Sequence, residues 1–120
     1  MINNNYNSSY YLNINQYTNK KYKNIFIYTA WDVSNVTDMG AMFDDATSFN
    51  QPLDKWNTSN VKMMGSIFDG AADFDQNINT KTVTLDDGTT YTAWDISKLS
   101  SNLTDYDFPD GFPDNKKPTT

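Results

Sequence analysis

A 25-residue unit is written twice in this sequence, as WDVSNVTDMGAMFDDATSFNQPLDK from Trp31 and as WNTSNVKMMGSIFDGAADFDQNINT from Trp56. Self-similarity at a fixed period of this length indicates that neighbouring units bury each other's apolar faces. Aligned without gaps, the copies agree at Trp31/Trp56, Ser34/Ser59, Asn35/Asn60, Val36/Val61, Met39/Met64, Gly40/Gly65, Phe43/Phe68, Asp44/Asp69, Ala46/Ala71, Phe49/Phe74 and Gln51/Gln76.

Each unit combines two hydrophobic periods. Around the tryptophan the period is two, as in Trp31 and Val33, which predicts a short strand. Val36, Met39, Phe43 and Ala46 then follow at helical spacing, as do their counterparts in the second copy, which predicts a helix of about three turns. Ser34-Asn35 and Ser59-Asn60 would cap these helices at the N-terminus. A left-handed residue, Gly70 or its counterpart Asp45, would end them.

A segment of 13 residues, KTVTLDDGTTYTA at 81–93, precedes a third tryptophan, Trp94. Alternating Thr and Val around Asp-Asp-Gly is typical of a β-hairpin. An Asp87-Gly88 turn of two residues would put Val83 and Tyr91 on opposite faces. We prefer a three-residue loop, Asp86 to Gly88, because it pairs Val83 with Tyr91 and gives the hairpin one apolar face.

The third unit, 94–112, begins like the others and then departs from the pattern. Tyr106 and Phe112 stand at the places of Phe43 and Phe49, but Pro109 falls where the helix should continue, which predicts a short or irregular helix. Such a unit is either a cap or a truncation. The expected organisation is an Asn- and Tyr-rich disordered segment at 1–24, a repeat body at 25–112 (units 31–55, 56–80 and 94–112, hairpin 81–93) and a flexible tail at 113–120.

Composition narrows the function. The 120 residues include no cysteine and no histidine, which removes disulfides, thiolate nucleophiles and the commonest general base and transition-metal ligand. We therefore expect neither an enzyme nor a cofactor nor a metal site. Fifteen acids against nine bases disfavour nucleic acid as a partner. No window reaches the roughly 18 apolar residues of a transmembrane segment, and the N-terminal residues do not resemble an export signal.

Two acidic clusters and one polar face remain as candidate sites. Asp73, Asp75 and Asn77 have the opening spacing of a calcium loop, but Ile78 replaces the required glycine, which favours an acidic loop. A second cluster is either a weak site for a hard cation or a solvated cap, and it comprises Asp105, Asp107, Asp110 and Asp114. Outward strand residues would form a ladder that contacts a partner, and these are Asp32, Asn57 and Asp95 with Lys55 and Ser59 beside them.

The pattern W-D-x-S-x-V-T-x-M-x-x-M-F-x-x-A-x-x-F-N-Q resembles the BspA-type leucine-rich repeat of bacterial surface proteins. The variant with T-x-T-V-x-L-x-D-G-T-T-Y-T-A-W-D resembles the repeats of mycoplasma surface lipoproteins, and the likeness covers about 28–112. It implies an α/β, leucine-rich-repeat-like solenoid of about two and a half units. It also implies a cell-surface or secreted location and a non-catalytic role in adhesion or as a variable antigen, with a host protein or glycan as partner.

Two departures from that family leave an alternative open. Its members usually carry an export signal, and the lipoproteins a lipid-modified cysteine, neither of which occurs in this sequence. Residues 1–24 also do not fit the pattern. The alternative is a fragment or spacer of a larger repeat protein, without independent activity and located in the cytoplasm.

Overall fold

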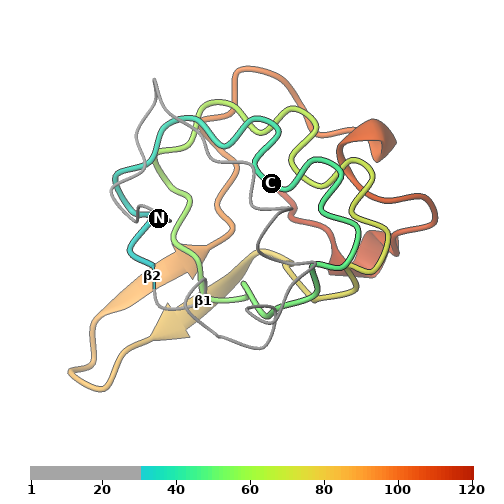
Figure 1. Cartoon of the computed structure of the whole chain (residues 1–120). Helices are drawn as coiled ribbons and strands as arrows, with labels where there is room; N and C mark the ends of the chain where they lie inside the picture. The colour runs from blue at the N-terminus through green and yellow to red at the C-terminus, as the bar shows by residue number, and fades with distance from the viewer. Residues whose placement is uncertain (1–30) are drawn as a thin grey trace.

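The computed structural model describes residues 31–120 (Figure 1). The disordered segment expected at 1–24 and residues 25–30 of the expected repeat body lie outside these residues. Residues 31–120 contain no α-helix. They contain two strands, β1 (Lys81–Thr84) and β2 (Thr90–Ala93), and two short 3-10 helices, η3 (Asp105–Asp107) and η4 (Asp114–Lys116). The prediction of an α/β, leucine-rich-repeat-like solenoid is therefore wrong, as are the short strands expected at Trp31, Trp56 and Trp94.

Successive turns occupy the places where helices were expected. The Met42 N–H donates to the Met39 carbonyl at 3.3 Å, and the Ala46 N–H donates to the Phe43 carbonyl at 3.1 Å. Within these turns Ala41 and Asp45 are left-handed, with φ of 54° and 56°. In the second unit Ser66 and Gly70 repeat this, with φ of 57° and 72°. The left-handed conformation predicted at Asp45 and Gly70 is thus confirmed, but a second such residue four positions earlier prevents any helix from propagating.

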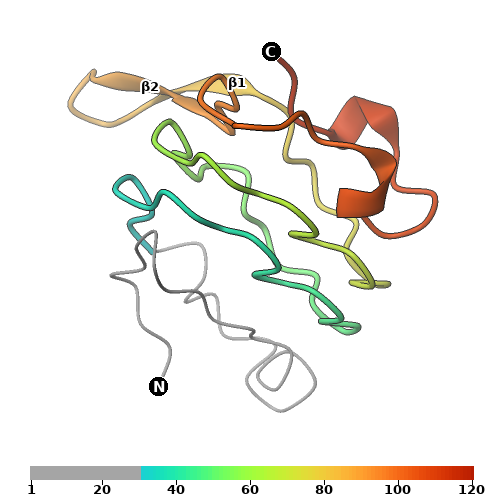
Figure 2. The ribbon, with the colours of Figure 1, turned by 90° about the horizontal axis from the view of Figure 1, so that it is seen from above.

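Backbone hydrogen bonds between the units explain this conformation. Every second N–H from Met39 to Asp45 donates to the second unit, whereas an α-helix would use all of these groups internally. The four bonds are Met39 to Met63 at 2.8 Å, Ala41 to Gly65 at 2.8 Å, Phe43 to Ile67 at 2.9 Å and Asp45 to Asp69 at 2.7 Å, each from N–H to carbonyl oxygen. Consequently the two units lie side by side, as Figure 2 shows.

Aromatic rings from successive units form rows through the core. Phe68 stacks between Phe43 and Phe108, with centroid distances of 5.1 and 6.4 Å. In a second row, Phe74 lies between Phe49 and Phe112, at 5.9 and 5.7 Å. Trp56 and Trp94 stack at 6.1 Å. All these rings are at most 7 % exposed.

The third unit enters these rows with a shifted register. Phe112 takes the place equivalent to Phe49, as the sequence predicts. Tyr106, expected at the place of Phe43, is instead 85 % exposed, and Phe108 stacks on Phe68. Two additional residues therefore precede the buried ring in the third unit.

The hairpin has the predicted register. β1 and β2 are antiparallel and Val83 pairs with Tyr91. The Leu85 N–H donates to the Thr89 carbonyl at 2.8 Å across the three-residue loop, where Gly88 has a φ of 87°. Val83 and Ala93 are buried, whereas Leu85 near the loop is 48 % exposed. The apolar face therefore covers the body only at the base of the hairpin.

Residues 113–120, for which the sequence predicts a flexible tail, lie against the second unit. The Ile78 N–H donates at 3.0 Å to the carbonyl of Lys116, the last residue of η4. The Thr119 N–H donates to Thr80 Oγ1 at 2.9 Å, and the hydroxyl in turn donates to the Trp94 carbonyl at 2.7 Å. This segment therefore joins the edge of the second unit to the base of the hairpin.

Gly70 provides a test of the contact between the units. A Cβ at this position would lie 2.1 Å from Asp45 Oδ1, and the φ of 72° disfavours any side chain. We expect Gly70→Ala to lower the free energy of unfolding by about 1–2 kcal/mol through its left-handed backbone alone, with the contact adding to this. Urea unfolding measures the loss.

Asp45→Gly in the Gly70→Ala background should recover the part of the lost stability that comes from the contact with the Asp45 side chain. The effects of the two substitutions on the free energy of unfolding should therefore not be additive. Gly65→Ala is the matched control, because nothing lies within 4 Å of the new Cβ and its stability should be little changed. Additivity of Asp45→Gly and Gly70→Ala would contradict the contact.

Candidate functional site

The polar positions expected to face a partner lie in turns. Asp32 Oδ1 accepts the Ser34 N–H at 3.0 Å and the Ser34 hydroxyl at 2.6 Å. Asn57 accepts the Ser59 N–H at 3.1 Å, and Asp95 accepts the Ser97 N–H at 2.9 Å. Each side chain thus closes a turn with the residue two positions on. The recurring spacing of Asp or Asn followed by Ser carried this signal in the sequence, where it was interpreted as a strand.

These turns are joined along one edge of the units. Asn60 Nδ2 donates to the Ser34 carbonyl at 2.8 Å, and Lys98 Nζ donates to Asn60 Oδ1 at 3.0 Å. Lys55 is exposed, and its carbonyl accepts the Tyr91 hydroxyl at the base of the hairpin. The binding role assigned to Asp32, Asn57, Asp95, Lys55 and Ser59 stays a prediction.

The Asp32 turn makes a testable prediction about pH. Its pKa is lowered from the ordinary value, first by the hydrogen bond from the Ser34 side chain and then by that from the Ser34 backbone. A carboxyl with a depressed folded pKa stabilises the fold above its unfolded pKa, and this stabilisation is lost as pH falls through the folded pKa. We expect Ser34→Ala to raise the pKa of Asp32, measured by NMR titration of the carboxyl carbon. An unchanged pKa would contradict the hydroxyl's role.

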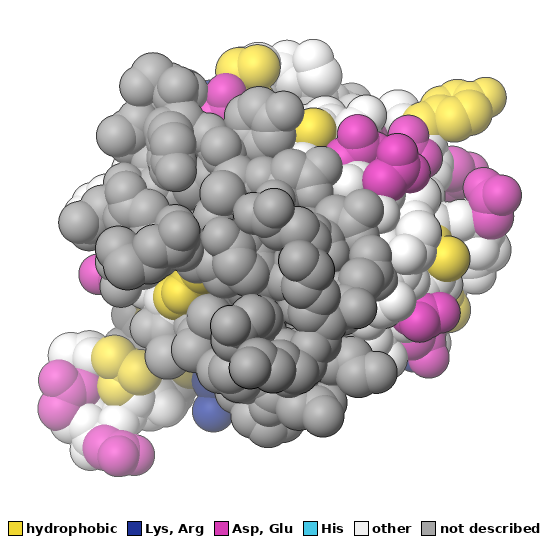
Figure 3. Space-filling model, in the orientation of Figure 1, with side chains coloured by type: hydrophobic (Ala, Val, Ile, Leu, Met, Phe, Trp, Pro, Cys, Tyr) yellow, Lys and Arg dark blue, Asp and Glu magenta, His cyan; other side chains and the backbone are white. Residues whose placement is uncertain are grey.

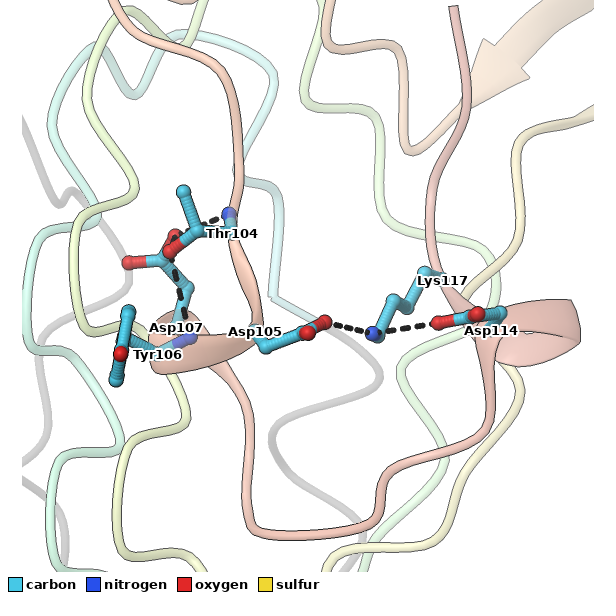
Figure 4. Close-up of polar contacts among 6 residues, drawn as sticks. All are labelled: Thr104, Asp105, Tyr106, Asp107, Asp114 and Lys117. Carbon is cyan, nitrogen blue, oxygen red and sulfur yellow. Dashed lines mark hydrogen bonds and ion pairs between the residues drawn. The ribbon is translucent and has the colours of Figure 1, made fainter.

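The acidic C-terminal cluster is organised by a lysine (Figure 4). Lys117 Nζ lies 2.7 Å from both Asp105 Oδ1 and Asp114 Oδ1, and these two hydrogen bonds raise the pKa of Lys117. Asp107 caps η3, because its Oδ2 accepts the Thr104 N–H at 2.7 Å while Oδ1 accepts the Ser66 N–H at 2.7 Å. The lysine thus supplies a cation beside two of the four carboxylates.

Two residues of the calcium-like spacing have partners within the fold. Asp75 forms an ion pair with Lys116, and Asn77 Oδ1 accepts the Asn79 N–H at 3.0 Å. Asp110 borders a cavity of about 290 Å³ beside Phe108 and Phe112. Within residues 31–120 there is no group of three or more His, Cys, Asp or Glu that could hold a metal ion.

A groove of about 410 Å³ separates part of the second unit from the third. The sequence does not predict this groove, because the exposure of Met63 and the shifted register of the third unit are apparent only in the structure. Met63 is 54 % exposed at its wall, whereas the neighbouring Met64 is buried. The lining residues are Lys62 to Gly65, Ser100 to Thr104 and Asp107.

Acidic side chains dominate the charged surface that Figure 3 shows. Some of them lie at the outer end of the hairpin, where Thr89 donates two hydrogen bonds to Asp87 and so lowers the pKa of Asp87. This charge agrees with the formal net charge of −6 for the chain. That nucleic acid is not a partner stays a prediction.

No helix among residues 31–120 is long and apolar enough to cross a membrane. Residues 4–108 match a protein-family model described as "Mycoplasma protein of unknown function, DUF285". No curated protein and no solved structure matches the chain. Since the family match extends over most of the 120 residues, the chain belongs to this Mycoplasma family.

Proposed function

We propose that this chain is a non-catalytic scaffold displayed at the bacterial surface, where it acts in adhesion or as a variable antigen. The observation that carries the proposal is the division between buried and exposed positions in the two units. Their six identical apolar pairs are buried in both copies, and these are Trp31/Trp56, Val36/Val61, Met39/Met64, Phe43/Phe68, Ala46/Ala71 and Phe49/Phe74.

Exposed positions differ between the same two units. Thr47 is replaced by Ala72, and Asn50 by Asp75, and all four residues are exposed. None of these side chains belongs to the aromatic rows, and of the four, Asn50 also bonds the second unit, because its Oδ1 accepts the Asp75 N–H at 2.9 Å. One buried framework can therefore present different surfaces, which suits an antigen or adhesin whose contacts change while its fold persists.

The titratable groups of the described region support a non-catalytic role. Asp32, Asp107 and Asp114 accept hydrogen bonds from neighbours that fix turns or the C-terminal segment. The pKa of Asp44 is raised, first by burial and then by Asp45 and Asp69, but none of these residues borders the groove. Paired carboxylates act as acid and base when their environments separate their pKa values around a substrate pocket.

A spacer without independent activity is the second candidate. It is favoured by the turns at Asp32, Asn57 and Asp95, because these side chains bond to the local backbone instead of facing a partner. On this interpretation the surface residues connect or separate other parts of a larger protein.

Two measurements test the proposal. Protease treatment of intact mycoplasma cells should remove the epitopes of the chain, and a protected chain would contradict surface display. The purified chain should bind saturably to members of an array of host matrix proteins and glycans. Phe68→Ala, which disrupts the core, should lose this binding, whereas Leu85→Ser on the hairpin should fold normally. A folded chain that binds nothing on the array would favour the spacer.

A further inference from the structure

The hydrogen-bond ladder between units has a gap at the groove. The first unit donates the Met39 N–H to the Met63 carbonyl at 2.8 Å, and Asp38 and Met63 form a parallel β-bridge. Met64 is the equivalent of Met39 in the second unit. Its N–H has no acceptor among residues 31–120, and Met64 borders the groove. The second unit therefore lacks, at this point, the neighbouring backbone that the first unit has.

The shifted register of the third unit causes this gap. The Ser100 N–H donates to the Lys62 carbonyl at 2.9 Å, just as the Lys62 N–H donates to the Thr37 carbonyl at 2.8 Å one unit earlier. The chain then leaves the second unit and rejoins it where the Phe68 N–H donates to the Asp107 carbonyl at 2.9 Å. Residues 101–106 lie between these two bonds, and Ser101 to Thr104 with Asp107 line the opposite wall of the groove.

A second backbone N–H at the groove, that of Gly65, also lacks the hydrogen bond that its equivalent in the first unit makes. The Gly40 N–H donates to Asp38 Oδ1 at 2.8 Å, but Met63 replaces this aspartate in the second unit. The Gly65 N–H has no acceptor in the described range. A Cβ at Gly65 would meet nothing within 4 Å, so the space beside this residue is open. Two adjacent N–H groups thus border one groove.

We propose that this groove binds an extended peptide segment of a partner protein, paired parallel to residues 63–65. The chain itself shows the geometry, because Met63 forms a parallel β-bridge with Asp38 beside the first unit and its carbonyl accepts the Met39 N–H. Addition of an extended segment to unpaired backbone groups is a common mode of peptide recognition. A carbonyl of the bound segment accepts the Met64 N–H.

The lining sets the preferred peptide. Exposed Met63 and half-buried Leu103 offer adaptable apolar contacts to one side chain of the peptide. Lys62 is exposed and forms no ion pair within the described range, whereas both oxygens of Asp107 already accept hydrogen bonds. The formal charges of Lys62 and Asp107 cancel, but the Lys62 amine has no ion-pair partner in the described range, so it favours an acidic residue next to the apolar one in the peptide.

NMR titration of the ¹⁵N-labelled chain tests the groove with defined peptides. The first probe is acetyl-NVKMMGS-amide, which copies residues 60–66, and the second replaces its lysine with aspartate to give acetyl-NVDMMGS-amide. Both should shift the Met64 and Gly65 amide resonances saturably, the acidic peptide at lower concentration. The absence of a saturable shift with both peptides would overturn the proposal. A stronger saturable shift at these amides with a methyl glycoside would also overturn it.

Two variants locate the binding. Gly65→Val should fill the open space and weaken peptide binding at least about tenfold. Met63→Ser should also weaken it, and it serves alone if Gly65→Val fails to fold. Leu85→Ser is the matched control, because Leu85 has a similar exposure of 48 % but lies on the hairpin. Equal affinity for Gly65→Val, or for Met63→Ser where that variant serves alone, would overturn the proposal.

Peptide binding here deepens the proposed function, on which it rests for its partner, and the two can fail separately. If the peptides do not bind but the chain still binds host proteins on the array, the groove proposal fails and the surface role stands. If the peptides bind at Met64 but nothing on the array does, the groove stands and the adhesive role fails.

Discussion

Replacing Phe68 with alanine is expected to lower the free energy of unfolding by about 3–5 kcal/mol. Phe68 is fully buried and is the central ring of its row, with Phe43 at 5.1 Å and Phe108 at 6.4 Å. It also stacks on Phe74 at 4.1 Å. Its removal leaves a cavity between all three units. Because small domains are stable by about 5–15 kcal/mol, this loss is a large share of the total.

Urea unfolding, followed by tryptophan fluorescence, measures this effect. Phe68→Leu should cost less, because it keeps most of the buried volume. Tyr106→Ala is the matched control for the register of the third unit, and with a side chain 85 % exposed it should change stability by no more than about 0.5 kcal/mol. A large loss for Tyr106→Ala with little loss for Phe68→Ala would contradict the observed rows.

Trp56→Ala should produce a comparable loss of about 3–5 kcal/mol. The indole is 2 % exposed and stacks on Trp94 at 6.1 Å, with Phe43 tilted against it at 6.0 Å. Its backbone carbonyl still accepts the Trp94 N–H in the variant, so the loss arises from the ring. A urea midpoint equal to that of the unchanged chain would contradict the core position.

Phenylalanine at either position keeps an aromatic contact, so Trp56→Phe should lose less than Trp56→Ala. Trp94→Phe removes the donor from Nε1 to the Leu53 carbonyl, a buried bond of 2.8 Å. Leaving that carbonyl unpaired costs about 1–3 kcal/mol beyond the packing loss.

The sequence was sufficient to predict the buried positions and the hairpin. Identical apolar residues in two copies, such as Phe49 and Phe74, marked the core because both units bury the same side chains against each other. The pairing of Val83 with Tyr91 followed from the need for one apolar face. Gly70 marked a left-handed backbone because few other residues adopt it without strain.

The backbone between those positions was not predictable from apolar spacing. Intervals of three and four residues fit an α-helix, but successive turns with inward side chains at Met39, Met42 and Ala46 produce the same intervals. The difference lies in where each N–H finds its acceptor, and this depends on the neighbouring unit. Ala41 and Ser66 have a left-handed backbone although neither residue type favours that conformation.

The candidate sites were harder to predict from the sequence for a related reason. Asp32, Asn57 and Asp95 have the composition of a polar face, but their turn hydrogen bonds depend on local backbone geometry. The groove depends on a two-residue shift in the third unit. Gapless alignment placed Tyr106 at the position of the buried ring, whereas the structure has Phe108 there. Only contacts between units reveal that shift.

Nuclear Overhauser effects between the two units test the central claim most directly, namely that backbone bonds between units replace helices. The amide proton of Ala41 donates to Gly65, and that of Phe43 to Ile67, so each should show strong effects to α-protons of the facing residues in the second unit. Effects from residue i to residues i+3 and i+4 throughout 36–46, without contacts to 61–71, would show a helix and contradict the fold.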